Sequence, residues 1–184
     1  LKLEDVTFLR NIATGNGGAL YSTGPRVETL NIRFGRSGGM GNIAAGNGGG
    51  AYLAPVLDGA VYTLTRGHFI DNQAVAGAAL FVGGLDAATT LVNQTFGENV
   101  ASDRATVEVA GTGGSLSINN ITMVDNQATT GTGGLRVENL TAVYMDNSLV
   151  AGNTGGVGVG RDCDLSTVVV PAGNFGRNFY ADPA

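Results

Sequence analysis

Three acidic residues stand at one position of a repeating pattern and could do chemistry together. Asp71, Glu98 and Asp125 each directly precede an Asn and follow one another at intervals of 27 residues. If each repeat forms one coil of a solenoid, the three carboxylates lie on consecutive coils. Such a column could supply the acid pair of a glycosidase or the oxygen ligands of Ca²⁺. The interpretation that we favour is a column of solvated turn residues.

The single histidine and the single cysteine limit the remaining chemistry. With His68 as the only histidine, a His-based triad or a His-rich metal site cannot form within the chain. With Cys163 as the only cysteine, an internal disulfide is excluded. We expect an exposed His68, an inert or partly buried Cys163, and a loop over the acidic stretch 161–164. We therefore expect no metal and no cofactor.

Three asparagines stand in Asn-x-Thr sequences, the acceptor pattern for N-glycosylation. They are Asn93, Asn120 and Asn139. The first two share one position in the repeat, so the repeat itself could generate them. In a eukaryotic secreted glycoprotein they would be glycan sites on outward-facing positions.

A hydrophobic residue followed three positions later by Asn recurs about every 27 residues. One interval is longer, and we attribute it to a loop inserted at Gly38–Ile43, where Ser37 stands in place of the Asn. The predicted structural pairs are Phe8 and Asn11, Phe34 and Ser37, Phe69 and Asn72, Phe96 and Asn99, Met123 and Asn126, Val150 and Asn153, and Phe175 and Asn178.

Two further segments complete each repeat. A pair of small residues leads into a short alternating segment, as in Gly17–Tyr21 and Gly155–Val159, and strand-forming residues precede each anchor, as in Glu28–Phe34. Three short strands per repeat predict an all-β fold, a right-handed parallel β-helix of about seven coils. Stacked coils would place the anchors in an internal stack and the Asn side chains in a corner ladder.

Composition narrows the class of function. The formal net charge of −5 and the pI of about 4.6 argue against nucleic acid as a partner. No apolar run is long enough to cross a membrane, so we expect no direct membrane insertion by this segment. Because the chain begins at Leu1 without Met, we expect residues 1–184 to be a single β-helix segment of a longer protein.

The pairing of Gly-Gly-Ala-Leu with Phe-x-x-Asn, clearest over Phe8 to Tyr21, resembles the repeat of the chlamydial polymorphic outer-membrane proteins. The resemblance covers nearly the whole chain. It implies a β-helix that is displayed outside the cell and acts in adhesion. Later repeats depart from the pattern, with Ser37 for Asn, Met123 and Val150 for Phe, and Asp103–Ala105 for Gly-Gly-Ala.

We therefore expect an extracellular or cell-surface protein with a structural or adhesive role, and we favour a non-enzymatic function over an enzymatic one. Its expected partners are other surface proteins, glycans or further β-helix coils, with end-to-end self-assembly into a filament. The alternative is a polysaccharide lyase or glycoside hydrolase that uses Asp71, Glu98 and Asp125. Ice binding through outward Thr7, Thr95 and Thr122 is a further alternative, and Arg33 and His68 interrupt that column.

Overall fold

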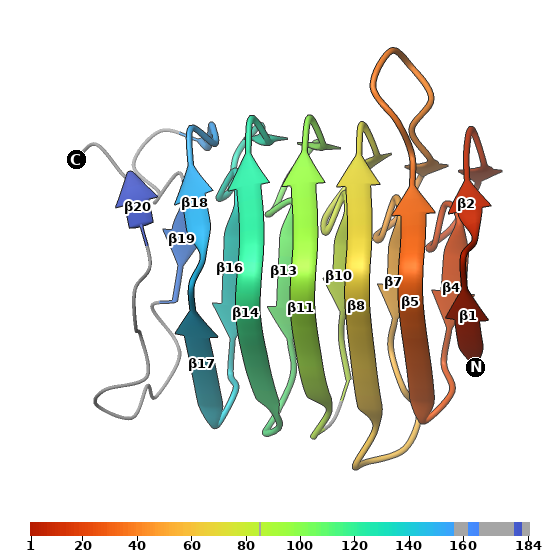
Figure 1. The fold of residues 1–184 in the computed structure, drawn as a ribbon, viewed down its shortest axis with the longest axis vertical. Coiled ribbons are helices and arrows are strands. Elements are labelled where there is room, and N and C mark those ends of the chain that lie inside the picture. The colour runs from red at the N-terminus through yellow and green to blue at the C-terminus, as the bar shows by residue number, and fades with distance from the viewer. Residues whose placement is uncertain (85, 157–161, 166–178, 182–184) are drawn as a thin grey trace.

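The chain coils into a solenoid of parallel strands. The computed structural model describes residues 1–84, 86–156, 162–165 and 179–181. These residues contain strands and no helix, and they make about 6 turns of ~27 residues each. In Figure 1 the near strands point upward and the far strands downward while the chain advances from right to left, which is a right-handed coil. The predicted right-handed parallel β-helix is confirmed. The seventh predicted anchor pair, Phe175 and Asn178, lies outside the described residues.

The largest sheet forms one long side of the rod. It has nine strands, and all of its pairings are parallel. Four long strands lie in its middle, two short strands lie at the N-terminal end and three at the other: β1 (Lys2–Glu4), β2 (Thr7–Phe8), β5 (Arg26–Phe34), β8 (Val61–Ile70), β11 (Ala88–Gly97), β14 (Ser115–Val124), β17 (Ala142–Asp146), β18 (Leu149–Ala151) and β20 (Phe179–Ala181).

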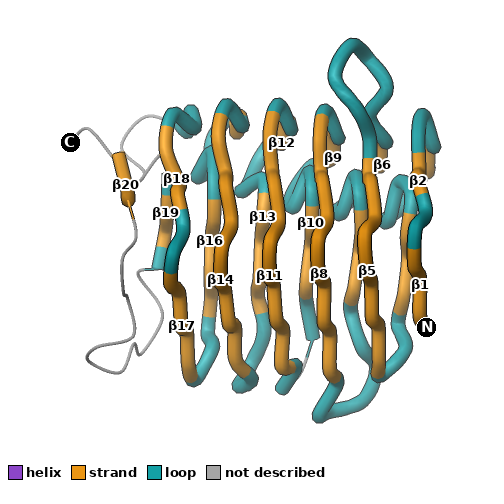
Figure 2. Tube along the Cα trace, in the orientation of Figure 1, coloured by secondary structure: helices purple, strands orange, loops and turns teal. Residues whose placement is uncertain are grey.

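Two narrower sheets close the coil (Figure 2). The five-stranded sheet follows the corner after each long strand and contains β3 (Ile12–Ala13), β6 (Ile43–Ala44), β9 (Gln73–Ala74), β12 (Val100–Ala101) and β15 (Gln127–Ala128). The six-stranded sheet runs back along the far side and contains β4 (Leu20–Ser22), β7 (Ala51–Leu53), β10 (Leu80–Val82), β13 (Val107–Ala110), β16 (Leu135–Glu138) and β19 (Cys163–Asp164).

Each long strand, or strand pair, bends at a residue with left-handed backbone geometry three positions before the anchor. Asparagine tolerates this conformation best among residues with a side chain. Four of the six positions are Asn, and all have φ between 48° and 54°: Asp5, Asn31, Arg66, Asn93, Asn120 and Asn147. The bend reverses the alternation, so the anchor side chain returns to the interior and its predecessor faces outward.

The interior of the rod contains a stack of aromatic rings from the anchors. The rings of Phe8, Phe34, Phe69 and Phe96 lie parallel, with successive centroids 5.2, 4.6 and 5.0 Å apart. Met123 and Val150 continue the column and are fully buried. Tyr62 is also fully buried; its hydroxyl donates to the Gly24 carbonyl over 3.2 Å, and burial raises its pKa to about 12. Apolar burial along one continuous column makes each coil depend on its neighbours.

The extra residues of the second repeat fall in two places rather than one. Part lengthens the corner at 35–41, which forms the loop standing above β5 in Figure 1, and part lengthens the connection 54–60 between β7 and β8. The prediction of an insertion at Gly38–Ile43 was therefore wrong in its bounds, since Ile43 belongs to β6.

The loop predicted for 161–164 was also wrong. Cys163 and Asp164 form β19 and pair with Leu135 and Arg136, so they continue the six-stranded sheet. The alternating segment predicted at 155–159 falls largely on 157–159, outside the described residues. Within the described ranges, no helix is long and apolar enough to span a membrane.

Candidate functional site

A ladder of asparagine side chains occupies the corner after the long sheet. The amide group of each Asn donates to the side-chain oxygen of the next over 2.7 to 2.9 Å. The members are Asn11, Asn42, Asn72, Asn99, Asn126 and Asn153. Asn42 takes the rung predicted for the second repeat near Ser37, because the insertion at 35–41 precedes the corner Asn.

The side chain of each interior rung makes at least four hydrogen bonds. The amide nitrogen of Asn99 donates to the Phe69 carbonyl at 2.8 Å and to Asn126 Oδ1 at 2.8 Å. Its Oδ1 accepts from the backbone and side chain of Asn72 at 3.0 and 2.9 Å. Asn99 is completely buried, so these bonds replace the water that the corner excludes.

An aspartate terminates the ladder. Asp162 Oδ1 accepts from the backbone and side-chain nitrogens of Asn153 at 2.9 and 2.8 Å. Asp162 is fully buried and directly precedes β19, nine residues after Asn153 in the chain. Its role was not predicted, because Asp162 is not at the ladder position of the repeat and it is not an Asn.

The three residues of the predicted acidic column lie in turns, and two of them bind the inserted loop. Asp71, Glu98 and Asp125 all adopt left-handed geometry directly before a ladder Asn. The backbone nitrogen of Gly39 donates to Asp71 Oδ2 at 2.7 Å, and the Ser37 hydroxyl donates to Glu98 Oε1 at 3.0 Å. Two of the three carboxylates thus hold the inserted loop. Among the described residues, no group of three or more His, Cys, Asp or Glu could hold a metal ion.

The three Asn-x-Thr asparagines are exposed. Asn93 and Asn120 occupy the bend of neighbouring long strands, and the Asn120 amide donates to Asn93 Oδ1 at 3.2 Å. Asn139 also has left-handed geometry, at φ 56°, directly after β16.

A shallow pocket opens on the outer face of the long sheet, near β2, β5 and β8. Its volume is about 280 Å³, and its lining contains Asp5, Thr7, Asn31, Ile32, Arg33 and His68. Arg33 and His68 are exposed cross-strand neighbours in the outward column that starts at Thr7. The Asn31 amide donates to Asp5 Oδ1, which joins the two bends at the rim of the pocket.

Two exposed arginines stand at or near this pocket: Arg33 lines it, and Arg66 lies outside its lining on the neighbouring strand. Arg66 lies at the bend of β8, across from Asn31 of β5, and both Arg66 and Arg33 are exposed. Within the part of the chain that the structure describes, neither arginine forms an ion pair. Two cationic side chains therefore stand free beside His68 in a protein whose formal net charge is −5.

The outer face of the six-stranded sheet has a different character. Its central outward column begins with Tyr21, Tyr52 and Phe81, whose rings stack with centroids 5.3 and 5.1 Å apart. The strand register continues this column through Glu108, Arg136 and Asp164. Burial raises the pKa of Tyr52, and the neighbouring Tyr21 raises it further.

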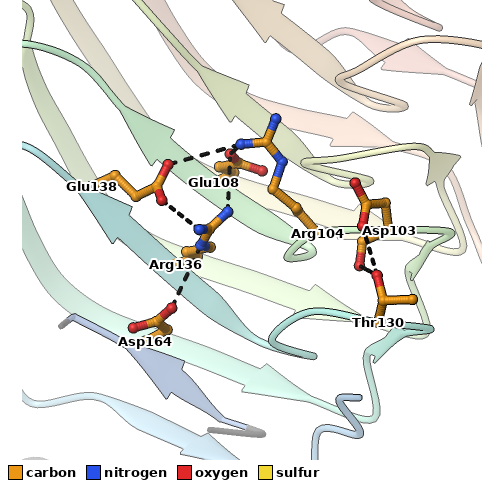
Figure 3. Close-up of polar contacts among 7 residues, drawn as sticks. All are labelled: Asp103, Arg104, Glu108, Thr130, Arg136, Glu138 and Asp164. Atoms are coloured by element: carbon orange, nitrogen blue, oxygen red, sulfur yellow. Dashed lines mark hydrogen bonds and ion pairs between the residues drawn. The ribbon is translucent and has the colours of Figure 1, made fainter. Parts of the chain in front are cut away.

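Glu108 is the centre of a charged network on that face (Figure 3). Its carboxylate is fully buried and lies 3.0 Å from Arg104 and 3.9 Å from Arg136. Arg136 also contacts Glu138 and lies 3.5 Å from Asp164, and Arg104 lies 3.9 Å from Glu138. Burial raises the pKa of Glu108 above its ordinary value, although both arginines act to lower it.

Sequence reasoning missed this network and the pocket. The only available signal was strand alternation, which puts Arg136 and Glu138 on the same outward face of one strand, and no regular spacing connects them with Arg104 or Glu108. The members of the network come from three coils, and their contacts can be predicted only when the strand register is known. No protein-family model, curated protein or solved structure matches the chain.

Proposed function

We propose that the chain is a non-enzymatic, extracellular structural or adhesive β-helix segment of a cell-surface or filament-forming protein. The observation that carries this proposal is the Asn ladder, which runs from Asn11 to Asp162 and joins every described coil to the next. A ladder that satisfies buried polar groups at each corner holds the coils in register and stiffens the rod. A stiff rod suits display of outward side chains at a distance from a surface.

The repeat and the rod geometry support display in different ways. The resemblance to polymorphic outer-membrane proteins favours adhesion at a cell surface. Strands β1, β3 and β4 pair on one side only among the described residues, and such edges can accept a further coil or a second rod. Proteins and glycans contacting the outer faces are the other proposed partners.

Adhesion can be tested with the purified chain coupled to beads. We expect beads carrying the folded chain to bind animal-cell or extracellular-matrix surfaces above the level of beads carrying heat-unfolded chain. Asn99→Ala beads serve as a second control, because this change damages the ladder and leaves the outer faces unchanged in composition. Equal binding by folded and unfolded chains would contradict a role that depends on the rod.

The second candidate function is a polysaccharide lyase or glycoside hydrolase. It is favoured by the placement of Asp71, Glu98 and Asp125 at equivalent turns of successive coils. Turnover of pectin, alginate or related polymers that disappears in Asp125→Asn would establish this function in place of the structural one. Asp125 is the suitable target, because Asp71 and Glu98 also hold the inserted loop.

A further inference from the structure

The free arginines lie on a surface that also offers groups suited to sugar hydroxyls. Asp5 and Asn31 line the same pocket as Arg33 and His68. Carboxylate and amide groups accept and donate hydrogen bonds at fixed positions, which is how proteins orient polar ligands in pockets. Guanidinium groups bind carboxylate and sulfate oxygens through paired hydrogen bonds.

A second depression lies on the same sheet face. Its volume is about 210 Å³, and it is lined by Lys2, Leu3, Glu28, Thr29, Leu30, Thr63 and Thr65. Leu30 contributes apolar surface there, and the threonines carry hydroxyl groups. Leu30 and Asn31 are consecutive in β5, so the two depressions adjoin along the strand.

We propose that the outer face of β1, β2, β5 and β8 binds an anionic glycan, with Arg33, His68 and Arg66 contacting its carboxylate or sulfate groups. This inference rests on the proposed function and specifies its glycan partner. The first pocket receives an acidic sugar, and the neighbouring depression receives the adjoining sugar ring against Leu30. Because the depressions are shallow, several units of a polymer contribute to affinity together.

The charges around the pocket favour an anion over a cation at this place. Arg26, on the same strand, is held by Glu28, with Nε 2.7 Å from the carboxylate, and is not free to bind a ligand. Asp5 is engaged by the Asn31 amide. Arg33 and Arg66 have no such partner within the described ranges, and an acidic group from a glycan would supply one.

The test measures binding of the full chain to immobilised dextran sulfate, polygalacturonate, neutral dextran and poly-L-glutamate at low and high salt. We expect binding to one or both anionic glycans, weaker binding at high salt, and little binding to neutral dextran. Binding to dextran sulfate alone would identify sulfate as the recognised group, and binding to polygalacturonate alone would identify carboxylate.

The double variant Arg33→Gln/Arg66→Gln is expected to lose at least roughly tenfold in affinity, since each charge-assisted contact contributes about that factor. Arg10→Gln/Arg36→Gln removes the same charge from exposed positions outside the lining of both depressions and is expected to change affinity less than about threefold. Circular dichroism verifies that both variants are folded.

Three results would overturn the inference: equal losses in the two double variants, binding to poly-L-glutamate as strong as to either glycan, or no binding to either glycan. If beads carrying the chain still adhere to cells while both glycans fail, the proposed adhesive function stands and the assigned face is wrong. If cell adhesion fails while the glycans bind, the assigned glycan-binding face stands and the proposed adhesive function is wrong.

Discussion

The two broad faces of this rod use arginine in opposite ways. On the six-stranded sheet, Arg104 and Arg136 surround the buried Glu108, and Arg136 also contacts Glu138 and Asp164. On the long sheet, Arg33 and Arg66 are exposed beside a pocket and form no ion pair with any described residue. The same residue type therefore belongs to the scaffold on one face and is available to a ligand on the other.

This difference separates stability from recognition. A cation that neutralises a buried carboxylate cannot be removed without leaving that charge uncompensated. An exposed cation without a partner contributes little to folding. The comparison therefore predicts that changes on one face alter unfolding, whereas changes on the other alter binding.

The largest loss of stability is expected from a change in the buried asparagine ladder. Asn99→Ala is expected to lower the free energy of unfolding by about 4 kcal/mol, because several buried donors and acceptors lose their partners at once. Asn11→Ala, at the exposed end of the ladder with one side-chain donation to Asn42, should cost about 1 kcal/mol. Urea denaturation measures both, and equal losses would contradict a ladder whose contribution depends on burial.

The next largest effect is expected on the six-stranded face. Arg136→Gln should lower the free energy of unfolding by about 2 kcal/mol, because Glu108 keeps its charge and retains only Arg104 as a partner. Glu108→Gln should stay within about 1 kcal/mol of the wild type, because losing the ion pairs is offset by losing the desolvated charge. A larger loss of unfolding free energy in Glu108→Gln than in Arg136→Gln would contradict the interpretation of Glu108 as a buried charge that Arg136 neutralises.

The raised pKa of Glu108 predicts how pH acts on the same network. A carboxyl whose folded pKa exceeds its unfolded pKa contributes most to stability when protonated in both states, below the ordinary value of 4.5. That contribution decreases as pH rises through the folded pKa. The wild type should therefore gain stability relative to Glu108→Gln as pH falls toward 4.5 in chemical denaturation. A stability difference between the wild type and Glu108→Gln that does not change with pH would show that burial does not dominate the pKa of Glu108.

The smallest effect on stability is expected on the long sheet. Arg33→Gln and Arg66→Gln should each change the free energy of unfolding by less than about 0.5 kcal/mol, because both side chains are exposed and without ion-pair partners. Thermal and urea denaturation provide the measurement. A loss close to that of Arg136→Gln would mean that these arginines are part of the scaffold.

Sequence periodicity was sufficient to predict the fold class, because inward positions must repeat in every coil. Phe69 and Phe96 stand 27 residues apart and stack directly. The periodicity could not place Asn42, since an insertion of unknown length separates it from Phe34. It also could not identify Asp162, which binds Asn153 from a position nine residues later that does not match the 27-residue repeat.

Outward positions carry no such repetition, because solvent imposes no common requirement on them. The contact of Arg136 with Glu108 depends on strand register, and the pocket at Arg33 depends on the bends at Asp5 and Asn31. Neither leaves a regular spacing in the chain. The candidate site therefore became visible only when the coils were stacked in three dimensions.

The most direct test of the difference between the faces measures two quantities on two variants. Unfolding free energy and affinity for dextran sulfate and polygalacturonate would be determined for Arg136→Gln and for Arg33→Gln/Arg66→Gln under the same buffer conditions. We predict reduced stability with retained glycan affinity for Arg136→Gln, and retained stability with at least roughly tenfold weaker affinity for the double variant. If both variants lose the two properties together, the two faces do not differ as described.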